Sequence, residues 1–142
     1  MDVNLTGGCL CGAVRFTYSG ELGGMLGAVT VCHCESCRRA QGLATAVAPA
    51  EMDGFEVTQG GELIREYESS PGKMRAFCMA CGSPLYSRRT DKPKALRLRM
   101  GSFDTVPDQL RVQAHTYVRG QPAWLEHMAD APWFDGPEPG RP

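Results

Sequence analysis

The sequence predicts a single, mainly β domain with metal sites at a sheet junction. Short runs of alternating apolar and polar residues are separated by glycines, which is typical of short strands. The chain has 142 residues, 42% of them hydrophobic, which is enough for one buried core and too few for two comfortable domains. All seven cysteines fall in three tight clusters, a distribution that unrelated thiols would not show.

Most of the expected elements are strands. Residues 13–18 place Val14, Phe16 and Tyr18 on one face, as a half-buried strand does. Residues 27–31 predict a second strand, and residues 35–41 predict two helical turns closed by Gly42. The remaining expected strands are 44–48, ended by Pro49; 63–68 and 73–77, paired as a hairpin around 69–72; and 84–87, 95–100 and 115–118.

The end of the chain differs in composition from the rest. We assign residues 1–135 to the domain and predict that residues 136–142, rich in proline and glycine, form a disordered tail. Just before this tail lie Trp124, Trp133 and Phe134. Aromatic residues near a chain end usually fasten the last segment to the core, and that is our first interpretation here.

The charge balance argues against several classes of partner. With 15 basic and 16 acidic residues the net charge is -1, so neither nucleic acid nor an anionic membrane is expected as the main partner. The chain opens without a basic region and apolar run, and it lacks the ~18 consecutive apolar residues of a spanning helix. Clustered thiolates persist best in a reducing compartment, so we expect a cytoplasmic protein. A homodimer is possible on the sequence alone.

The cysteine spacing indicates metal rather than disulfides. An odd number of cysteines cannot all pair, and residues within one tight cluster cannot easily bridge each other. Tetrahedral zinc takes four thiolate or imidazole ligands in a structural site, and three plus an open position in a catalytic one. The seven cysteines therefore divide into a group of four, the quartet, and a group of three, the trio. The quartet is Cys9, Cys11, Cys78 and Cys81, and the trio is Cys32, Cys34 and Cys37.

Two alternatives stay open at this point. The trio could close on a fourth residue such as His33, His115 or an acidic side chain, which would make it a second structural site. Iron could replace zinc, since it also suits four thiolates.

An open trio favours thiol chemistry. Three thiolates make the bound ion a weaker Lewis acid than zinc held by histidines, so hydrolysis is disfavoured. A substrate thiol in the vacant position would instead be held as a nucleophilic thiolate. Arg38 and Arg39 follow the trio; they could offset its charge or hold a substrate carboxylate, or simply form a solvated helical face.

Several motifs together resemble one known family, the glutathione-dependent formaldehyde-activating enzymes, whose fold also occurs in centromere protein V-like and other non-enzymatic proteins. The likeness covers almost the whole chain. It is carried by Gly8-Cys9-Leu10-Cys11-Gly12, Cys32-His33-Cys34-Glu35-Ser36-Cys37-Arg38, Tyr67-Glu68-Ser69-Ser70-Pro71-Gly72-Lys73, Phe77-Cys78-Met79-Ala80-Cys81-Gly82-Ser83-Pro84-Leu85, and the end from His115 to Val118 with Trp124, Leu125 and Ala131-Pro132-Trp133-Phe134.

The resemblance implies a β-tent fold of twisted antiparallel sheets holding two zinc ions per chain. The structural ion would be bound by the quartet and the catalytic ion by Cys32, Cys34 and Cys37. The implied reaction joins glutathione and formaldehyde into S-(hydroxymethyl)glutathione, formally a carbon-sulfur lyase in reverse. His33 is expected to play a structural or supporting part. The alternative is a non-catalytic, zinc-stabilised binding module of the same fold.

Overall fold

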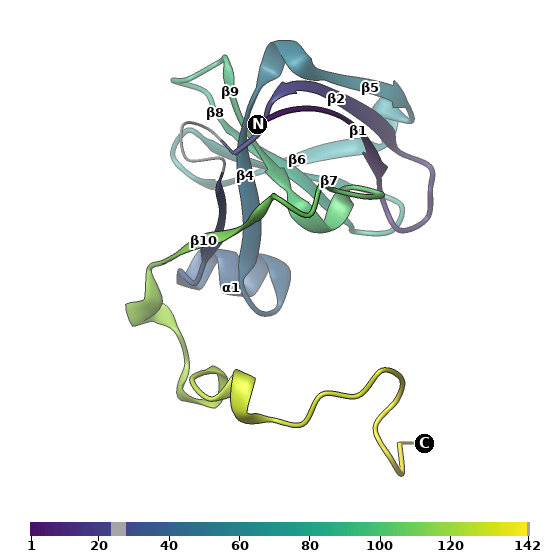
Figure 1. Cartoon of the computed structure of the whole chain (residues 1–142). Helices are drawn as coiled ribbons and strands as arrows, with labels where there is room; N and C mark the ends of the chain where they lie inside the picture. Colours follow the sequence, from purple (N-terminus) through teal and green to yellow (C-terminus); the bar gives the residue numbers. More distant parts are fainter. Residues whose placement is uncertain (24–27, 142) are drawn as a thin grey trace.

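Two β-sheets form the body of the protein in the computed structural model, which describes residues 1–23 and 28–141 (Figure 1). The smaller sheet has the strand order β1-β2-β5, and the larger has the order β10-β3-β4-β9-β8-β7-β6. The strands are β1 (Asp2–Gly8), β2 (Arg15–Glu21), β3 (Ala28–Cys32), β4 (Thr45–Glu51), β5 (Phe55–Gln59), β6 (Ile64–Ser70), β7 (Lys73–Cys78), β8 (Pro84–Arg89), β9 (Ala95–Arg99) and β10 (Arg111–Thr116).

Antiparallel pairing dominates both sheets. The exception is β10, which pairs in parallel with β3 at one edge of the larger sheet. Between β3 and β4 lies the helix α1 (Glu35–Gln41), at the end of the larger sheet (Figure 1). Short 3-10 turns occur at Met52–Gly54, Gly61–Leu63, Met100–Ser102, Val118–Gly120, Ala123–Leu125 and Met128–Asp130. No helix among the described residues is long and apolar enough to cross a bilayer.

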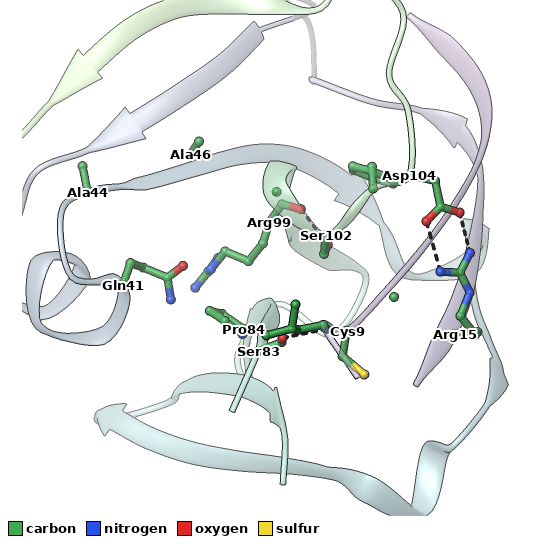
Figure 2. Close-up of a pocket in the computed structure, with 14 residues that line it drawn as sticks. Cys9, Arg15, Gln41, Ala44, Ala46, Ser83, Pro84, Arg99, Ser102 and Asp104 are labelled. Atoms are coloured by element: carbon green, nitrogen blue, oxygen red, sulfur yellow. Dashed lines mark hydrogen bonds and ion pairs between the residues drawn. The ribbon is translucent and has the colours of Figure 1, made fainter. Parts of the chain in front are cut away.

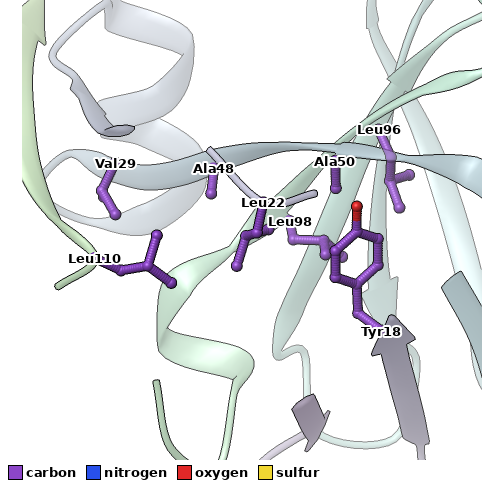
Figure 3. Packing of buried hydrophobic residues seen from close by; sticks show 8 residues of the cluster. All are labelled: Tyr18, Leu22, Val29, Ala48, Ala50, Leu96, Leu98 and Leu110. Atoms are coloured by element: carbon purple, nitrogen blue, oxygen red, sulfur yellow. The ribbon is translucent and has the colours of Figure 1, made fainter. Parts of the chain in front are cut away.

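The main core lies between the two sheets and follows the alternation of their strands. In β9, Leu96 and Leu98 turn toward it, while Arg97 and Arg99 turn to the opposite face. Burying a side chain of this size contributes about 1.5–3 kcal/mol, so this one-sided pattern sets which face is packed. Figure 3 shows the buried cluster, which comprises Tyr18, Leu22, Val29, Ala48, Ala50, Leu96, Leu98 and Leu110.

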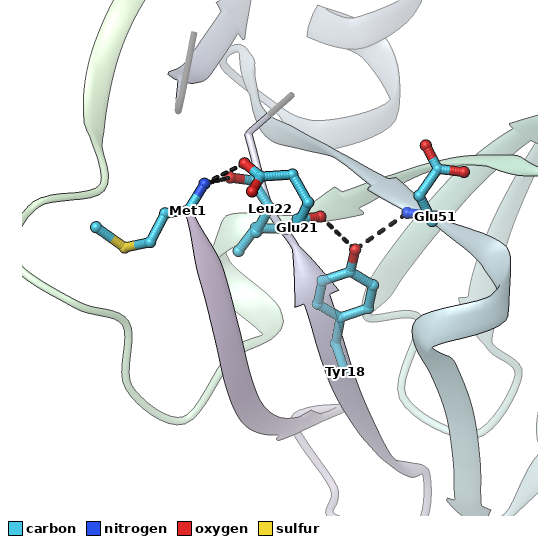
Figure 4. Close-up of polar contacts among 5 residues, drawn as sticks. All are labelled: Met1, Tyr18, Glu21, Leu22 and Glu51. Atoms are coloured by element: carbon cyan, nitrogen blue, oxygen red, sulfur yellow. Dashed lines mark hydrogen bonds and ion pairs between the residues drawn. The ribbon is translucent and has the colours of Figure 1, made fainter. Parts of the chain in front are cut away.

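Tyr18 also ties the sheets together through its hydroxyl (Figure 4). The ring is buried, and the hydroxyl accepts a hydrogen bond of 3.1 Å from the backbone N–H of Glu51, at the end of β4. It donates in turn to the carbonyl oxygen of Glu21. A buried hydroxyl without partners would cost free energy, so both bonds are needed here. The bond from Glu51 joins β2 to β4, whereas the bond to Glu21 stays within β2.

A second cluster packs where the sheets meet. Phe16 of β2 lies with its ring centroid 5.2 Å from that of Phe55 and 5.6 Å from that of Phe103. Gly7 of β1 approaches it so closely that an added Cβ would lie 2.5 Å from the Phe16 ring. A side chain at position 7 would therefore separate β1 from the core.

Several predicted elements are confirmed. The hairpin is present as β6 and β7, and the alternating run 13–18 overlaps β2. The helix spans the predicted residues 35–41, and Gly42 closes it in the left-handed conformation with φ of 84°. The predicted strand 27–31 overlaps β3, although Gly27 lies outside the described residues. Strands 84–87 and 95–100 correspond to β8 and β9.

The expectation that Pro49 ends its strand is wrong. β4 continues through Pro49, which is in register with Arg97 of β9. The carbonyl oxygen of Pro49 accepts a bond from the N–H of Gly23, and the pairing with β3 covers only residues 45–47 of β4. The N–H that proline lacks would thus point beyond the residues of β3 that pair with β4, where the ladder needs no donor.

Two further differences concern the strands. Sequence reasoning missed β1 and β5. The predicted strand 115–118 is instead β10, which ends at Thr116 because Tyr117 adopts a left-handed conformation with φ of 55°. The prediction of a tail at 136–142 stays a prediction.

The interpretation of the late aromatic residues is also corrected. Trp124 is 66% exposed, Trp133 is 78% exposed and Phe134 is 55% exposed. Beyond β10 the chain runs away from the sheets (Figure 1). In this segment the buried side chain is Leu125.

Candidate metal centres

The quartet joins two similar turns, one in each sheet. Cys9 and Cys11 lie between β1 and β2, whereas Cys78 ends β7 and Cys81 lies before β8. In each turn the residue after the second cysteine is a glycine with φ of 77°, and its N–H bonds back to the carbonyl of the first cysteine at 3.1 Å or 2.7 Å. Only glycine adopts this conformation without strain, so the local sequence sets both turns.

The two turns are brought face to face. The four Sγ atoms lie within 4.8 Å of one another, with Cys9 and Cys11 3.5 Å apart. Across the junction, the backbone N–H of Leu10 donates to Ser83 Oγ at 2.9 Å. Four sulfurs at this spacing could hold one tetrahedral ion, whose bonds to sulfur are about 2.3 Å long. The predicted grouping of the quartet therefore has the required geometry.

The close approach of four sulfurs splits the pKa values of the quartet. Hydrogen bonds from the Ser83 side chain and the backbone of Cys11 lower the pKa of Cys81 to about 5. The backbone of Ala13 lowers the pKa of Cys11, but interaction with the Cys9 thiol, burial and the other two cysteines outweigh it and raise the pKa to about 11. Thiolates this close repel one another unless a cation lies between them, as in a metal site.

The trio is assembled at the junction of β3 and α1. Cys32 ends β3, and Cys34 is the N-cap of α1, where its Sγ accepts a bond of 3.3 Å from the backbone N–H of Cys37. The three Sγ atoms lie within 4.8 Å of one another. Among the described residues, neither His33 nor His115 nor a carboxylate joins this group. The trio could hold a metal ion with one coordination position left over.

Arg75 of β7 reaches the trio from the neighbouring part of the sheet. Its Nη1 and Nη2 atoms lie 3.8 Å and 3.7 Å from Cys37 Sγ, and its Nε donates to Ser69 Oγ at 2.9 Å. Burial raises the pKa of Cys37, but hydrogen bonds from Thr45, Cys34 and Arg75 outweigh it and lower the pKa to about 7. Arg75 thus stabilises the thiolate form that a metal requires.

His33 lies behind the trio rather than in it. Its Nε2 lies 2.8 Å from Nδ1 of His115, and its backbone N–H donates to Thr116 O at 2.9 Å. The neighbouring Gly120 packs so tightly that an added Cβ would lie 2.9 Å from the His33 carbonyl oxygen. Burial lowers the pKa of His33, which favours the neutral ring. These contacts brace the loop that carries Cys32 and Cys34.

A cavity of about 600 Å³ opens from the trio along the larger sheet. Cys32, Cys34 and Cys37 line one end of it. The rest of the lining is polar and strongly basic, and includes Lys73, Arg75, Ser87, Arg89, Arg97 and Arg99. The trio therefore faces a space large enough for a small ligand.

These basic residues were missed by the sequence reasoning, which considered Arg38 and Arg39. Arg39 is exposed and pairs with Glu35 at 3.0 Å, as a solvated helical face would. The residue that contacts the trio is Arg75, which lies 38 positions from Cys37 in the sequence. The signal available was the alternation of arginine with leucine in residues 95–99, but it does not show which strand lies beside α1.

A second cavity, of about 500 Å³, lies beside the quartet (Figure 2). The Arg15 guanidinium and the Asp104 carboxylate form an ion pair at its rim. Arg99 lines both this cavity and the one beside the trio. This buried arginine therefore borders the surroundings of both cysteine groups.

Comparison with known proteins agrees with this arrangement of cysteines. Residues 4–120 match the glutathione-dependent formaldehyde-activating enzyme family. The chain belongs to this family. The match contains all seven cysteines and β10. It also contains the basic face of the cavity beside the trio, which consists of Lys73, Arg75, Arg89, Arg97 and Arg99. The exposed aromatic residues 124, 133 and 134 lie outside it.

A solved structure supports the same fold. The chain is similar to a Rhodobacter sphaeroides protein of known crystal structure, with 25% sequence identity and a TM-score of 0.63. The similarity covers 79% of this chain and 100% of the Rhodobacter protein. The mainly β fold is therefore shared across the whole length of that relative.

Proposed function

We propose that this family member is a zinc-dependent carbon-sulfur lyase. It would catalyse, in both directions, the addition of a small thiol to formaldehyde, and we expect glutathione to be the thiol. The observation that carries the proposal is a trio of cysteines without a fourth ligand among the described residues, at the end of a cavity of about 600 Å³. A structural site would close all four positions, whereas a catalytic one leaves room for a substrate.

We assign different roles to the quartet and the trio because their ligand numbers and surroundings differ. We assign zinc to both groups, structural at Cys9, Cys11, Cys78 and Cys81 and catalytic at Cys32, Cys34 and Cys37. Zinc at the trio would supply a Lewis acid that keeps a coordinating thiol ionised at neutral pH. Arg75 fixes Cys37 and offsets its charge, and the braced loop holds the other two sulfurs in place.

The reaction is an addition without oxidation or reduction. The thiol releases its proton, and its sulfur forms a bond to the carbonyl carbon of formaldehyde. The π electron pair of the carbonyl moves to oxygen, which takes up a proton to give the hydroxymethyl thioether. Confinement of both reactants in the cavity raises their effective concentration. No residue is assigned as general base.

Zinc content and thiol binding test this proposal together. We expect two zinc ions per chain, and cobalt placed at the trio should change its visible spectrum when glutathione is added. Exchange NMR with ¹³C-formaldehyde should show faster adduct formation than without protein. A Cys34→Ser variant should remain folded with one zinc and lose both effects. If glutathione leaves the cobalt spectrum unchanged, the lyase assignment is wrong.

The alternative is a non-catalytic binding module of the same fold. The exposed side chains of Trp124, Trp133 and Phe134 favour it, because large exposed apolar side chains are typical of interaction surfaces. It predicts that both metal sites are closed by protein ligands. X-ray absorption that finds four protein sulfur or nitrogen ligands at the trio would support this alternative and contradict the enzyme.

Three further assignments concern the location, the fold and the oligomeric state of the protein. Two thiolate-rich sites are stable in a reducing compartment, which supports a cytoplasmic location. We assign the two-sheet arrangement to the β-tent fold. The homodimer stays a prediction, which sedimentation of the purified protein would test.

A further inference from the structure

Five cationic side chains gather on the face of the larger sheet beside the trio. Lys73 and Arg75 come from β7, Arg89 from β8, and Arg97 and Arg99 from β9. The register explains the gathering, because Lys73 is opposite Arg89, and Ser87 is opposite both Arg75 and Arg97. Residues paired in this way point to the same side of a sheet. Among the described residues that line the cavity there is no carboxylate.

Most of this positive charge has no partner within the described chain. None of the ion pairs there involves Lys73, Arg75, Arg97 or Arg99. Arg99 is only 5% exposed; its Nη1 donates to Ser87 Oγ at 3.2 Å, and its buried Nε lacks a hydrogen-bond partner. Arg97 is exposed, whereas Lys73 and Arg75 are half-buried. Unpaired charge on the buried or half-buried groups is unfavourable, so they favour a bound anion, which the exposed Arg97 can reach.

Burial and mutual repulsion change the pKa values of two of these cations, Lys73 and Arg99. Burial, followed by repulsion from Arg97, Arg99 and Arg75, lowers the pKa of Lys73 to about 8. Burial likewise lowers the pKa of Arg99 to about 10, with a further contribution from Arg75. Both groups would regain their ordinary affinity for protons if a negative group bound between them.

The trio itself does not account for this much positive charge. Three thiolates around a divalent ion carry a net charge of about -1, and Arg75 already lies beside Cys37. Arg89 is paired with Asp91 at 2.9 Å. Three cations remain, Lys73, Arg97 and Arg99, and formaldehyde is neutral. The other reactant, the thiol, must therefore supply the balancing negative charge.

The position of the cations also sets how far the ligand reaches. In β4, Thr45 is in register with Cys32 of the trio, and Pro49 is in register with Arg97. Four residues along a strand span about 13 Å, which is near the ~10 Å length of an extended tripeptide. Lys73, Arg89 and Arg97 also line an adjoining hollow of about 150 Å³ beyond the main cavity. Its lining adds Arg88 and Lys92 and one carboxylate, Glu51, so the cations there outnumber the carboxylate. A ligand with its sulfur at the trio can thus place a distant group here.

We propose that Lys73 and Arg97 anchor an acidic group at the far end of the thiol substrate, so that the enzyme selects thiols bearing at least two acidic groups, one of them about a tripeptide's length from the sulfur. This inference rests on the proposed function. The acidic groups are carboxylates or phosphates, which arginine and lysine bind alike by charge-assisted hydrogen bonds. Lys73 and Arg97 are binding residues, distant from the reacting atoms.

Binding of S-methylglutathione tests the anchor separately from thiol ligation, because its sulfur is a thioether. Calorimetry on the zinc-loaded protein should show affinity reduced about 10- to 100-fold by Arg97→Gln and by Lys73→Met, the usual effect of losing a hydrogen bond to a charged group. Lys73→Arg should restore most of it. Arg111→Gln, which removes an exposed arginine of β10, is the matched control and should change affinity less than twofold.

Substrate series identify the acidic group. Glutathione should react at least 10-fold faster than its diethyl ester at low concentration, and coenzyme A should be compared in the same way with the neutral thiol pantetheine. A larger ratio in the first pair assigns the anchor to carboxylate, and in the second to phosphate. Equal rates within both pairs, or equal effects of Arg97→Gln and Arg111→Gln, would overturn the proposal.

The two proposals fail in different ways. If no thiol alters the cobalt spectrum of the trio but S-methylglutathione still binds in an Arg97-dependent manner, the anchor stands and the lyase assignment is wrong. If thiols alter the spectrum equally whatever their charge, the lyase assignment stands and the anchor is wrong.

Discussion

The quartet and the trio contain the same ligand atoms in different surroundings. The quartet lies between two sheets, where Cys9 and Cys78 belong to a hydrophobic cluster with Phe16 and Leu85. The trio lies at one end of a single sheet, beside a basic cavity. A metal at the first place joins distant parts of the chain, whereas at the second it faces a ligand space. The number of sulfurs and their surroundings would together distinguish a structural centre from a reactive one.

Removing one sulfur from each group should have the largest effect. Cys78→Ser should abolish cooperative unfolding, since structural zinc in small domains contributes about 10 kcal/mol or more and Cys78 is fully buried. Cys34→Ser should leave a cooperative transition at a slightly lower temperature. Thermal melts followed by circular dichroism check this. A folded Cys78→Ser protein together with an unfolded Cys34→Ser protein would reverse the assignment.

Chelation should separate the two metals in time. The trio has a free coordination position, so EDTA should remove its metal at least ~10-fold faster than that of the quartet. A colorimetric zinc assay should show one fast equivalent released with the secondary structure intact, and one slow equivalent released with unfolding. Cys34→Ser, as the control, should show only the slow phase. Release of both metals in a single phase would contradict the comparison.

Arg75 should matter to the trio alone. Because its guanidinium contacts Cys37 Sγ, Arg75→Gln should weaken metal binding at the trio about 10-fold, as loss of a residue that supports a metal ligand does. Chelator titration of the fast equivalent measures this. The matched control is Arg39→Gln on the exposed side of α1, which should leave both metals unaffected. An equal effect on the quartet would show general destabilisation.

The basic face should give ligand binding a pH dependence through Lys73. Its pKa in the free protein is about 8, against an ordinary 10.5, and an anion favours the charged form. Affinity for S-methylglutathione should therefore be full below pH 8 and fall by up to about tenfold per pH unit above it. The charged or titratable groups facing Lys73 are Cys37 of α1, Arg75 of β7, Arg89 of β8, and Arg97 and Arg99 of β9.

Calorimetry between pH 7 and 9 measures the dependence. Lys73→Arg stays charged throughout this range and should bind with constant affinity apart from titration of the ligand's own amine. A native protein whose profile matches that of Lys73→Arg would exclude Lys73 from the anchor.

The smallest effect is expected at the rim of the cavity beside the quartet. Hydrogen bonds from Arg15 and Thr6 lower the pKa of Asp104 to about 2 from 3.8. Its stabilising contribution should thus be present above pH 4 and disappear as the pH falls toward 2. Asp104→Asn should lower the urea midpoint slightly at pH 6 in low salt and less in ~1 M salt, since exposed ion pairs contribute little and are screened by salt. An equal shift at both salt concentrations would rule out the ion pair as its cause.

The sequence by itself determined the grouping of the cysteines and much of the local structure. Cysteine spacing, positive-φ glycines and strand alternation act over a few neighbouring residues, so the helix 35–41, the hairpin of β6 and β7, and the division into four and three were all accessible. The same local view failed at Pro49, where the outcome depends on how far a neighbouring strand extends, and at Trp133, where no local rule states what the ring will contact.

Only the tertiary structure decided what surrounds the trio. Arg75 and Cys37 are distant in sequence, and they meet because β7 and α1 are placed together by the pairing order of the larger sheet. Whether Arg97 and Arg99 face solvent or a common cavity depends on the same strand order. Long-range pairing therefore turned scattered arginines into a basic face, because charges separated along a chain interact strongly only after folding brings them within a few ångströms.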